Sequence, residues 1–221
     1  WSVPVYDRSN ATPIIVGDRI IVMAEPDQVL CFDRHTGRQL WTRFVNRYFA
    51  TPQAERDANP AFQETLDPLV AKLPEMKTLE ERMALRKEID AALVAIDAKK
   101  YKLDWDGHMK GHFRVVGWTV GTPVSDGKFV YVWCGNGIAA CYDLDGNTRW
   151  IRRVNEGKLY YPASPALIAG KLIAFASGGF NMVALDAATG AERATLTGHT
   201  HWVNACAISP DGTWIVSASG D

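Results

Sequence analysis

The sequence predicts an all-β fold built from repeated four-stranded units, interrupted once by a helical segment. The first observation is a run that occurs three times, as Thr12–Val22, Thr122–Val132 and Ser164–Ala174. The second is an aspartate that ends a short apolar run 21 or 22 residues after the first residue of each copy. A repeat of fixed period is the signature of an architecture assembled from copies of one supersecondary unit.

Each repeat contains short strand-forming runs separated by turn-forming residues. Ile20–Met23 and Phe129–Trp133 are rich in β-branched and aromatic residues, which favour strands. Glycine, aspartate and asparagine lie between such runs and are typical turn formers, as in Gly135–Gly137. Units of about 40 residues with four strands each are typical of propeller blades. We therefore predict blades of four antiparallel strands, in a half-propeller or a ring of about four blades.

The pattern of the second motif resembles a known family of propeller repeats. Ala184–Gly190, together with the spacing of Asp33, Gly37 and Trp41, resembles the pyrroloquinoline-quinone-like (PQQ-like) repeat. The resemblance covers residues 1–47, as one blade preceded by the last strand of another, and residues 117–194, as two further blades. It implies that a tryptophan docks each blade on the next one. The implied structural docking residues are Trp1, Trp41, Trp150, Asp33, Asp143 and Asp186.

The pattern changes in the third copy, where Ala194 takes the place of the docking tryptophan. The following text, with Gly198-His199 and the turn Ser209–Gly212, resembles a WD (Trp-Asp) repeat over residues 195–221. In that family a His, a Ser or Thr, an Asp and a Trp form a buried hydrogen-bonded tetrad. The resemblance implies three members here, with Ser219 as an alternative to the serine: His199, Ser217 and Asp221. The Trp and the Trp-Asp dipeptide are missing, so the blade is expected to be partial, and the change of family suggests natural or engineered recombination.

A charge-rich interruption at residues 48–116 separates the first two repeats. Thr78–Glu81 forms a capping box, which marks the start of a helix. An apolar stripe follows at helical spacing, and a shorter helix is predicted over residues 61–73 and ends before Pro74. The stripe consists of Leu79, Met83, Ile89, Leu93 and Ile96. We expect a helical hairpin that packs on the surface of the blades and is dispensable for their folding.

Composition limits the partners. The chain has 221 residues, 47% hydrophobic and 22% charged, enough for one large or two small globular domains. A net charge of −1 gives no electrostatic case for nucleic acid or an anionic membrane as partner. No run approaches the roughly 20 apolar residues of a membrane helix. The chain begins without an initiating Met, which predicts a segment or a processed product.

No candidate cofactor or metal site follows from the remaining residues. The four cysteines form no C-x-x-C pair. Cys31 and Cys141 share a repeat position that is alanine in the third copy, and a position that accepts either residue is predicted to be small and buried. His108 and His112 would share a face only of a helix, which the neighbouring glycines disfavour. The acidic turn at Asp143 lacks the rest of a calcium loop. Three aromatic residues are weighed as a contact surface, although packing in the core is the simpler reading: Trp105, Tyr160 and Tyr161.

The preferred function is a non-catalytic scaffold that binds proteins or ligands on the loop faces of a propeller. The enzymatic rival is a fragment of a PQQ-dependent quinoprotein dehydrogenase, a branch of the resembling family that often carries a pair of adjacent cysteines absent here. A third hypothesis is an engineered chimera without a natural function. The expected partner is a second copy in a homodimer, or a missing propeller half, because unfinished blades present unpaired edges. The compartment is open, with the periplasm or the extracellular space favoured by the PQQ-like part and the cytoplasm by the WD part.

Overall fold

The computed structural model describes residues 1–5, 10–102, 118–154, 163–176, 181–201, 203–209, 211 and 213–220. In these residues the chain forms three antiparallel sheets of four strands and one antiparallel sheet of two strands. Each four-stranded sheet has its strands in sequence order, as expected for a propeller blade. The predicted all-β blade architecture with a helical insertion is therefore confirmed.

The blades follow one another along the chain. Blade 1 comprises β1 (Ile14–Val16), β2 (Arg19–Ala24), β3 (Gln28–Asp33) and β4 (Gln39–Phe44). Blade 2 comprises β5 (Val124–Ser125), β6 (Phe129–Cys134), β7 (Ile138–Asp143) and β8 (Thr148–Arg153). Blade 3 comprises β9 (Ala166–Ile168), β10 (Lys171–Ala176), β11 (Asn181–Asp186) and β12 (Glu192–Leu196). The half-blade consists of β13 (Val203–Ile208) and β14 (Ile215–Ser219).

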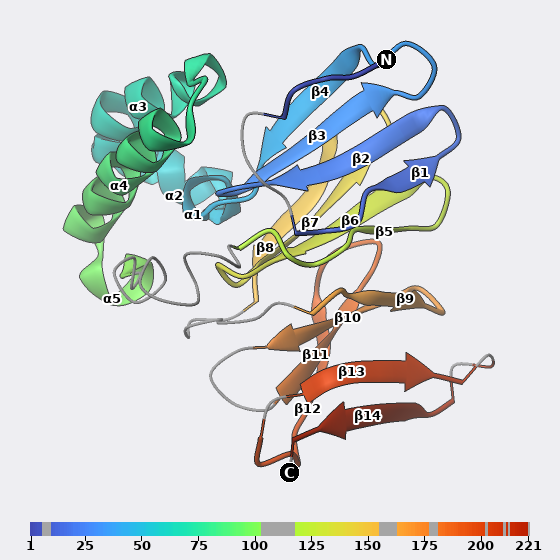
Figure 1. The fold of residues 1–221 in the computed structure, drawn as a ribbon. Coiled ribbons are helices and arrows are strands. Elements are labelled where there is room, and N and C mark those ends of the chain that lie inside the picture. Colours follow the sequence, from blue (N-terminus) through green and yellow to red (C-terminus); the bar gives the residue numbers. More distant parts are fainter. Residues whose placement is uncertain are drawn as a thin grey trace.

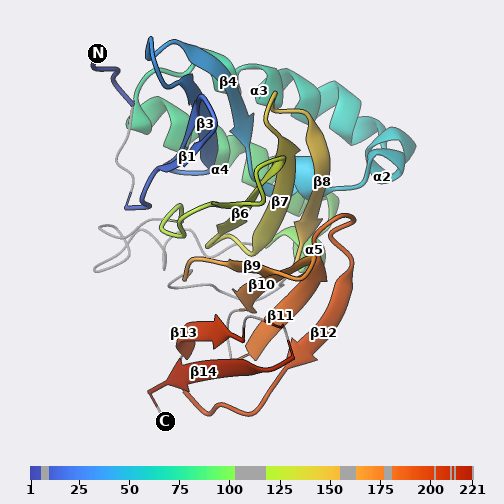
Figure 2. The ribbon, with the colours of Figure 1, turned by 90° about the vertical axis from the view of Figure 1, so that its right-hand side faces the viewer.

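The four sheets form an open array, with blade 1 at one end and the half-blade at the other (Figures 1 and 2). The N- and C-termini lie at these opposite ends in both views. The first strands of the three complete blades lie side by side, and their apolar residues line a shallow hollow. No strand is assigned over residues 1–5, where the sequence analysis expected the last strand of a preceding blade.

Apolar side chains fill the seams between successive blades. Ile21 and Cys31 of blade 1 belong to the same buried cluster as Val132 and Ala140 of blade 2. A second cluster joins blade 2 to blade 3. The middle strands are covered on both faces, which explains why β3 and β7 read as nearly continuous apolar runs rather than as alternating ones. Cys31 and Cys141 are buried at the same position of the register, as expected for small core residues.

The insertion is helical and has its own core. It contains α1 (Arg47–Ala50), α2 (Gln53–Ala58), α3 (Asp67–Ala71), α4 (Leu79–Ile96) and α5 (Ala98–Tyr101). The capping box at Thr78 is present, with reciprocal hydrogen bonds between Thr78 and Glu81. The shorter predicted helix consists of a π-helical turn (Phe62–Leu66), α3 and a 3-10 turn (Leu73–Glu75), so Pro74 lies within that final turn.

The buried face of α4 differs from the predicted apolar stripe. Ile89 and Leu93 are buried as expected, whereas Leu79, Met83 and Ile96 are only partly buried. The other buried residues of α4 are Leu85 and three charged residues: Arg82, Arg86 and Asp90. The prediction used hydrophobicity alone, so it did not include the charged residues of this face, of which Arg86 contacts a charged partner on the first blade.

That partner is Asp27, in the turn between β2 and β3. The Nε atom of Arg86 lies 2.8 Å from Oδ2 of Asp27, and both side chains are 1% exposed. Burial raises the pKa of Asp27, while the charge of Arg86 opposes this rise. The insertion therefore contacts blade 1 through a buried ion pair. This contact argues against the expectation that the insertion is dispensable.

Candidate protein-interaction site at the C-terminal half-blade

Two indole groups connect successive blades, and a third docks the N-terminal segment on blade 1 in the same way. The Nε1 atom of Trp41, on β4, donates a hydrogen bond of 3.0 Å to the backbone carbonyl of Leu144 in blade 2. Trp150, on β8, donates one of 2.8 Å to the carbonyl of Ala187 in blade 3. Trp1 donates one of 3.0 Å to the carbonyl of Arg34 in blade 1. The structure thus places all three predicted docking tryptophans against the next turn along the array.

Each indole packs closely against a glycine of the receiving turn. A Cβ atom added to Gly37, Gly146 or Gly190 would lie 2.6 to 2.7 Å from an indole carbon atom, closer than real contacts allow. These glycines also have φ values of +72°, +83° and +70°, which disfavour any residue with a side chain. Two independent constraints therefore require glycine at this position: the positive φ of the turn and the close approach of the indole.

The three predicted aspartates act on the turn and not on the indole. Oδ1 of Asp33 accepts hydrogen bonds from the backbone amides two and three residues on, and so does Oδ1 of Asp186. Oδ1 of Asp143 accepts them from the amides two and four residues on. The carboxylate of Asp186 also accepts a hydrogen bond of 2.6 Å from the guanidinium of Arg193 and one from the hydroxyl of Thr189. These bonds lower the pKa of Asp186 to about 2. We infer that these aspartates hold the turns that receive the tryptophans, a role that mutation can test.

The series of docking tryptophans ends at blade 3. Trp41 pairs with Cys31 across β3 and β4, and Trp150 pairs with Cys141 across β7 and β8. At the same register of blade 3, Ala184 pairs with Ala194, which is exposed. At this register position, blade 3 therefore has an alanine where blades 1 and 2 have a docking indole.

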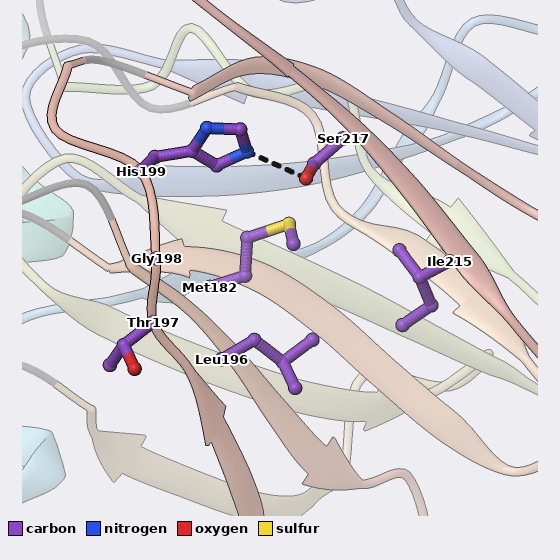
Figure 3. Close-up of a pocket in the computed structure, with 7 residues that line it drawn as sticks. All are labelled: Met182, Leu196, Thr197, Gly198, His199, Ile215 and Ser217. Atoms are coloured by element: carbon purple, nitrogen blue, oxygen red, sulfur yellow. Dashed lines mark hydrogen bonds between the residues drawn. The ribbon is translucent and has the colours of Figure 1, made fainter. Parts of the chain in front are cut away.

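A pocket of about 340 Å³ lies along this seam (Figure 3). Its apolar part comes from both sides of the seam, with Met182 and Leu196 from blade 3 and Ile215 from β14. Its polar rim includes the imidazole of His199, whose Nε2 lies 2.7 Å from Oγ of Ser217. The structure thus brings together two members of the predicted tetrad and selects Ser217 over Ser219. The third member, Asp221, lies outside the described residues.

The opposite face of the half-blade is apolar and uncovered. Trp214 is 56% exposed and Val216 is 53% exposed. The positions correspond in the repeat to Phe129 and Tyr131, and Tyr131 is buried between blades 2 and 3. In the described part of the chain, β14 pairs only with β13, so its other edge carries unpaired backbone groups. An open sheet edge beside an exposed apolar face is suited to binding another polypeptide.

The other chemical candidates do not form a site in the described residues. No group of three or more His, Cys, Asp or Glu in these residues could hold a metal ion. Burial raises the pKa of Cys31 to about 11 and that of Cys134 well above its usual value, so these thiols are poor nucleophiles. Five candidate residues lie outside the described part: Trp105, His108, His112, Tyr160 and Tyr161. Among the helices that the structure describes, none is both long and apolar enough to span a membrane.

Sequence reasoning missed two sets of buried polar contacts near the blade ends. One is the ion pair of Asp27 with Arg86. The other joins blade 1 to blade 2, where Glu25 accepts hydrogen bonds from Thr119 and the side-chain amide of Asn136 donates to the carbonyl of Val45. No sequence motif announces these pairs, because their members lie 59 to 94 residues apart.

Comparison with protein families gives two matches. The model described as outer membrane protein assembly factor BamB matches residues 1–137 and 80–200. The model described as WD domain, G-beta repeat, matches residues 190–221. A comparison with curated protein sequences found no match.

Two solved structures with TM-scores of at least 0.50 show the same fold. BamB from Moraxella catarrhalis superposes with a TM-score of 0.54 at 15% identity, over 100% of this chain and 48% of that protein. The computationally designed Ika4 protein superposes with a TM-score of 0.50 at 12% identity, over 95% of this chain and 86% of that one. A quinohemoprotein alcohol dehydrogenase from Pseudomonas putida HK5 gives a TM-score of 0.46 at 18% identity, over 86% of this chain and 20% of that one. The chain thus spans about half the length of the Moraxella protein.

Proposed function

This chain belongs to the family of the outer membrane protein assembly factor BamB, and from this premise we propose that it is a non-catalytic β-propeller scaffold that binds proteins. The family description names an assembly factor, a role carried out through contacts with other proteins. The geometry supports a scaffold because three docked blades form a rigid base for the loops and edges at their ends.

The open C-terminal end is the observation that carries this proposal. The half-blade presents the exposed side chains of Trp214 and Val216 beside the unpaired edge of β14. Aromatic and aliphatic groups at the centre of a surface patch are typical anchors of protein interfaces. Two partners fit this end: a second copy that forms a homodimer, or a missing propeller half. The loop faces would bind further proteins.

We propose that the protein works at the outer membrane, on the periplasmic side that its PQQ-like repeats favour. The support is the description of the family, which names the outer membrane. The surface gives no reason to expect nucleic acid as a partner, because the chain carries 24 basic and 25 acidic residues.

We also propose that the two repeat families join near residue 190. The BamB model extends to residue 200 and the WD model begins at residue 190, so both match a stretch that includes Gly190 and Ala194. A junction there would make the half-blade an addition to a PQQ-like array, natural or engineered. Sequencing the genomic locus that encodes residues 1–194 tests this. A locus that continues with PQQ-like repeats in place of residues 195–221 would show that the half-blade was joined on, and a locus that encodes residues 195–221 in the same reading frame would exclude an engineered junction.

Light scattering tests self-association at the open end. At micromolar concentrations we expect the mass to rise towards twice 24.4 kDa, and the double variant Trp214→Ser, Val216→Ser to remain at 24.4 kDa. Ile15, which is also exposed but lies on the inner strand of blade 1, provides the control substitution Ile15→Ser. A wild-type mass of 24.4 kDa at every concentration would exclude the homodimer. A dimer that both the double variant and Ile15→Ser retain would place the contact elsewhere.

A further inference from the structure

The helical insertion is held by blade 2 as well as by blade 1. We propose that the insertion is a clasp, which ties these two blades together at the end of their seam that lies opposite to the docking contact of Trp41. Such a clasp acts on the stiffness of the array and is independent of what the scaffold binds.

The attachment to blade 1 comes from a single residue of the β2–β3 turn, Asp27. Its carboxylate pairs with Arg86 of α4, at 2.8 Å and in a buried position. Its backbone carbonyl accepts a hydrogen bond of 2.8 Å from the amide of Val45, which lies two residues before α1. The same turn therefore holds both the root of the insertion and the long helix α4.

Blade 2 holds the start and the end of the insertion. At the start, the side-chain amide of Asn136, in the β6–β7 turn, donates a hydrogen bond of 2.6 Å to the carbonyl of Val45, and α1 packs against β8. At the end, Nη1 of Arg153, the last residue of β8, donates to the carbonyl of Lys100 in α5. A hydrogen bond from a charged donor is stronger than one between neutral groups. The insertion is thus anchored on blade 2 at two points.

The first and last helices of the insertion are also bonded to each other. Arg47, in α1, donates from Nη1 to the carbonyl of Tyr101 in α5. The hydroxyl of Tyr101 lies 3.0 Å from Oγ1 of Thr51 and donates a hydrogen bond of 2.9 Å to Glu55 of α2. Because these bonds join α1 and α2 to α5, an anchor at either end of the insertion restrains both ends.

The anchors on the two blades meet at Arg47, which is buried. Burial lowers the pKa of this guanidinium to about 10, the charge of Asp90 opposes this change, and the charges of Arg153 and Arg86 add to it. Arg153 belongs to blade 2, and Arg86 is the partner of Asp27 in blade 1. The insertion therefore brings anchors from both blades into one buried cluster of charges.

This cluster and the docking tryptophan hold opposite ends of one seam. Trp41 donates to the carbonyl of Leu144, in the turn that follows β7, whereas Asn136 lies in the turn that precedes β7. A strand of six residues separates the two turns by about 20 Å. The helices lie beyond one end of the strands of blades 1 and 2 (Figure 1). The seam is therefore closed by an indole at one end and by the insertion at the other.

Proton exchange of the indole groups in the intact protein tests this coupling. Arg153→Met removes an anchor on blade 2 and retains the apolar stem. We expect the Nε1 proton of Trp41 to exchange about tenfold faster or more in this variant, because the seam then opens without unfolding of the whole array. The Nε1 proton of Trp150, at the next seam, should exchange less than about threefold faster. Arg152→Met, at the exposed neighbouring position of β8, is the matched control and should leave both rates within about twofold of the wild type.

A second variant separates a clasp from two independent contacts. Arg86→Met, which removes the anchor on blade 1, should also accelerate the exchange of Trp41 more than that of Trp150. The double variant Arg86→Met, Arg153→Met should accelerate Trp41 by less than the product of the two single factors, because a clasp that has lost one anchor no longer bridges the blades.

Three results would each overturn the proposal. Equal acceleration of both indoles would mean that the variants only destabilise the whole fold. An unchanged rate at Trp41 would make the insertion an appendage of the seam, and single factors that multiply in the double variant would make the two contacts independent. If Arg153→Met does not fold, Arg153→Lys, which keeps the charge, should show the same order, with Trp41 accelerated more than Trp150, and the same three results would count against the clasp.

Discussion

Replacing Arg86 by methionine should destabilise the protein by several kilocalories per mole. Arg86 lies on α4 of the insertion and Asp27 in a turn of blade 1, with Nε and Oδ2 2.8 Å apart and both side chains 1% exposed. Asp90 lies 3.7 Å from the same guanidinium and is also buried. Methionine preserves most of the apolar stem but leaves the two buried carboxylates, Asp27 and Asp90, without that cation.

The magnitude follows from the burial of the pair. Removing one partner of a buried ion pair costs about 3–5 kcal/mol, because the other charge stays desolvated. For a domain with a stability of about 5–15 kcal/mol this is a large fraction of the total. With a urea m-value of about 2 kcal/mol/M, the unfolding midpoint should fall by roughly 1.5–2.5 M. Lys87→Met, at an exposed position of the same helix, should shift the unfolding free energy by less than about 0.5 kcal/mol.

The pH dependence of the loss gives a second readout. Burial already raises the pKa of Asp27, and Arg86 opposes that rise, so the variant should have a still higher pKa. A carboxyl group with a raised folded-state pKa destabilises the fold as pH rises from its unfolded value through the folded one. The difference in stability between Arg86→Met and wild type should thus be larger at pH 7 than at pH 4. Adding Asp27→Asn to Arg86→Met should recover part of the loss at pH 7.

The reasoning would be refuted by a loss below about 1 kcal/mol that matches the Lys87→Met control and is the same at both pH values. That result would mean that the insertion and blade 1 are energetically independent. It would also restore the expectation, drawn from the sequence, that the insertion is dispensable.

The remaining predictions concern the blade seams and the choice between scaffold and enzyme. Trp150→Ala should lower the unfolding free energy by about 3–5 kcal/mol, because the indole is buried and donates a hydrogen bond to blade 3. Trp214→Ala, at an exposed site, should have a small effect on it. Equal effects of the two variants in urea denaturation would contradict this prediction. Asp186→Asn should make the fall in stability between pH 4 and pH 2 less steep than in the wild type. A carboxylate with a pKa of about 2 stabilises the fold above its unfolded pKa and loses this contribution as pH falls through 2. Identical stability profiles of the two proteins over this pH range would refute the prediction. Addition of pyrroloquinoline quinone and Ca²⁺ should give neither co-eluting quinone absorbance nor alcohol-dependent dye reduction, and activity with both would favour the dehydrogenase.

The repeats made most of the fold predictable. The spacing from Thr12 to Asp33 and from Thr122 to Asp143 is local and periodic, so it located the blades and their turns. The docking contacts follow the same logic, because Trp41 and Gly146 occupy fixed positions in two adjacent repeats. The capping box at Thr78 was equally readable, since all its groups lie within four residues.

What the sequence could not predict depends on contacts between distant segments. The buried face of α4 contains Arg86 and Asp90, which a hydrophobic pattern assigns to solvent, and only the position of Asp27 explains their burial. The pocket at the C-terminal seam was also missed. It arises from the side chains that Met182 and Ile215 present to each other across two sheets, and from an alanine where an indole would otherwise pack.

Site-resolved hydrogen exchange of the protein alone most directly tests the claim that the array is docked through blade 3 and open beyond it. Opening free energies should be highest in the middle strands β6 and β7 of blade 2, which is docked to blade 1 on one side and to blade 3 on the other. They should be lowest among the strands in β13 and β14, which form a two-stranded sheet in the described residues and face Ala194 where the other seams have a docking tryptophan. If Val203–Ile208 and Ile215–Ser219 exchanged as slowly as β6 and β7 at low protein concentration, the C-terminal end would be closed and the account would be wrong.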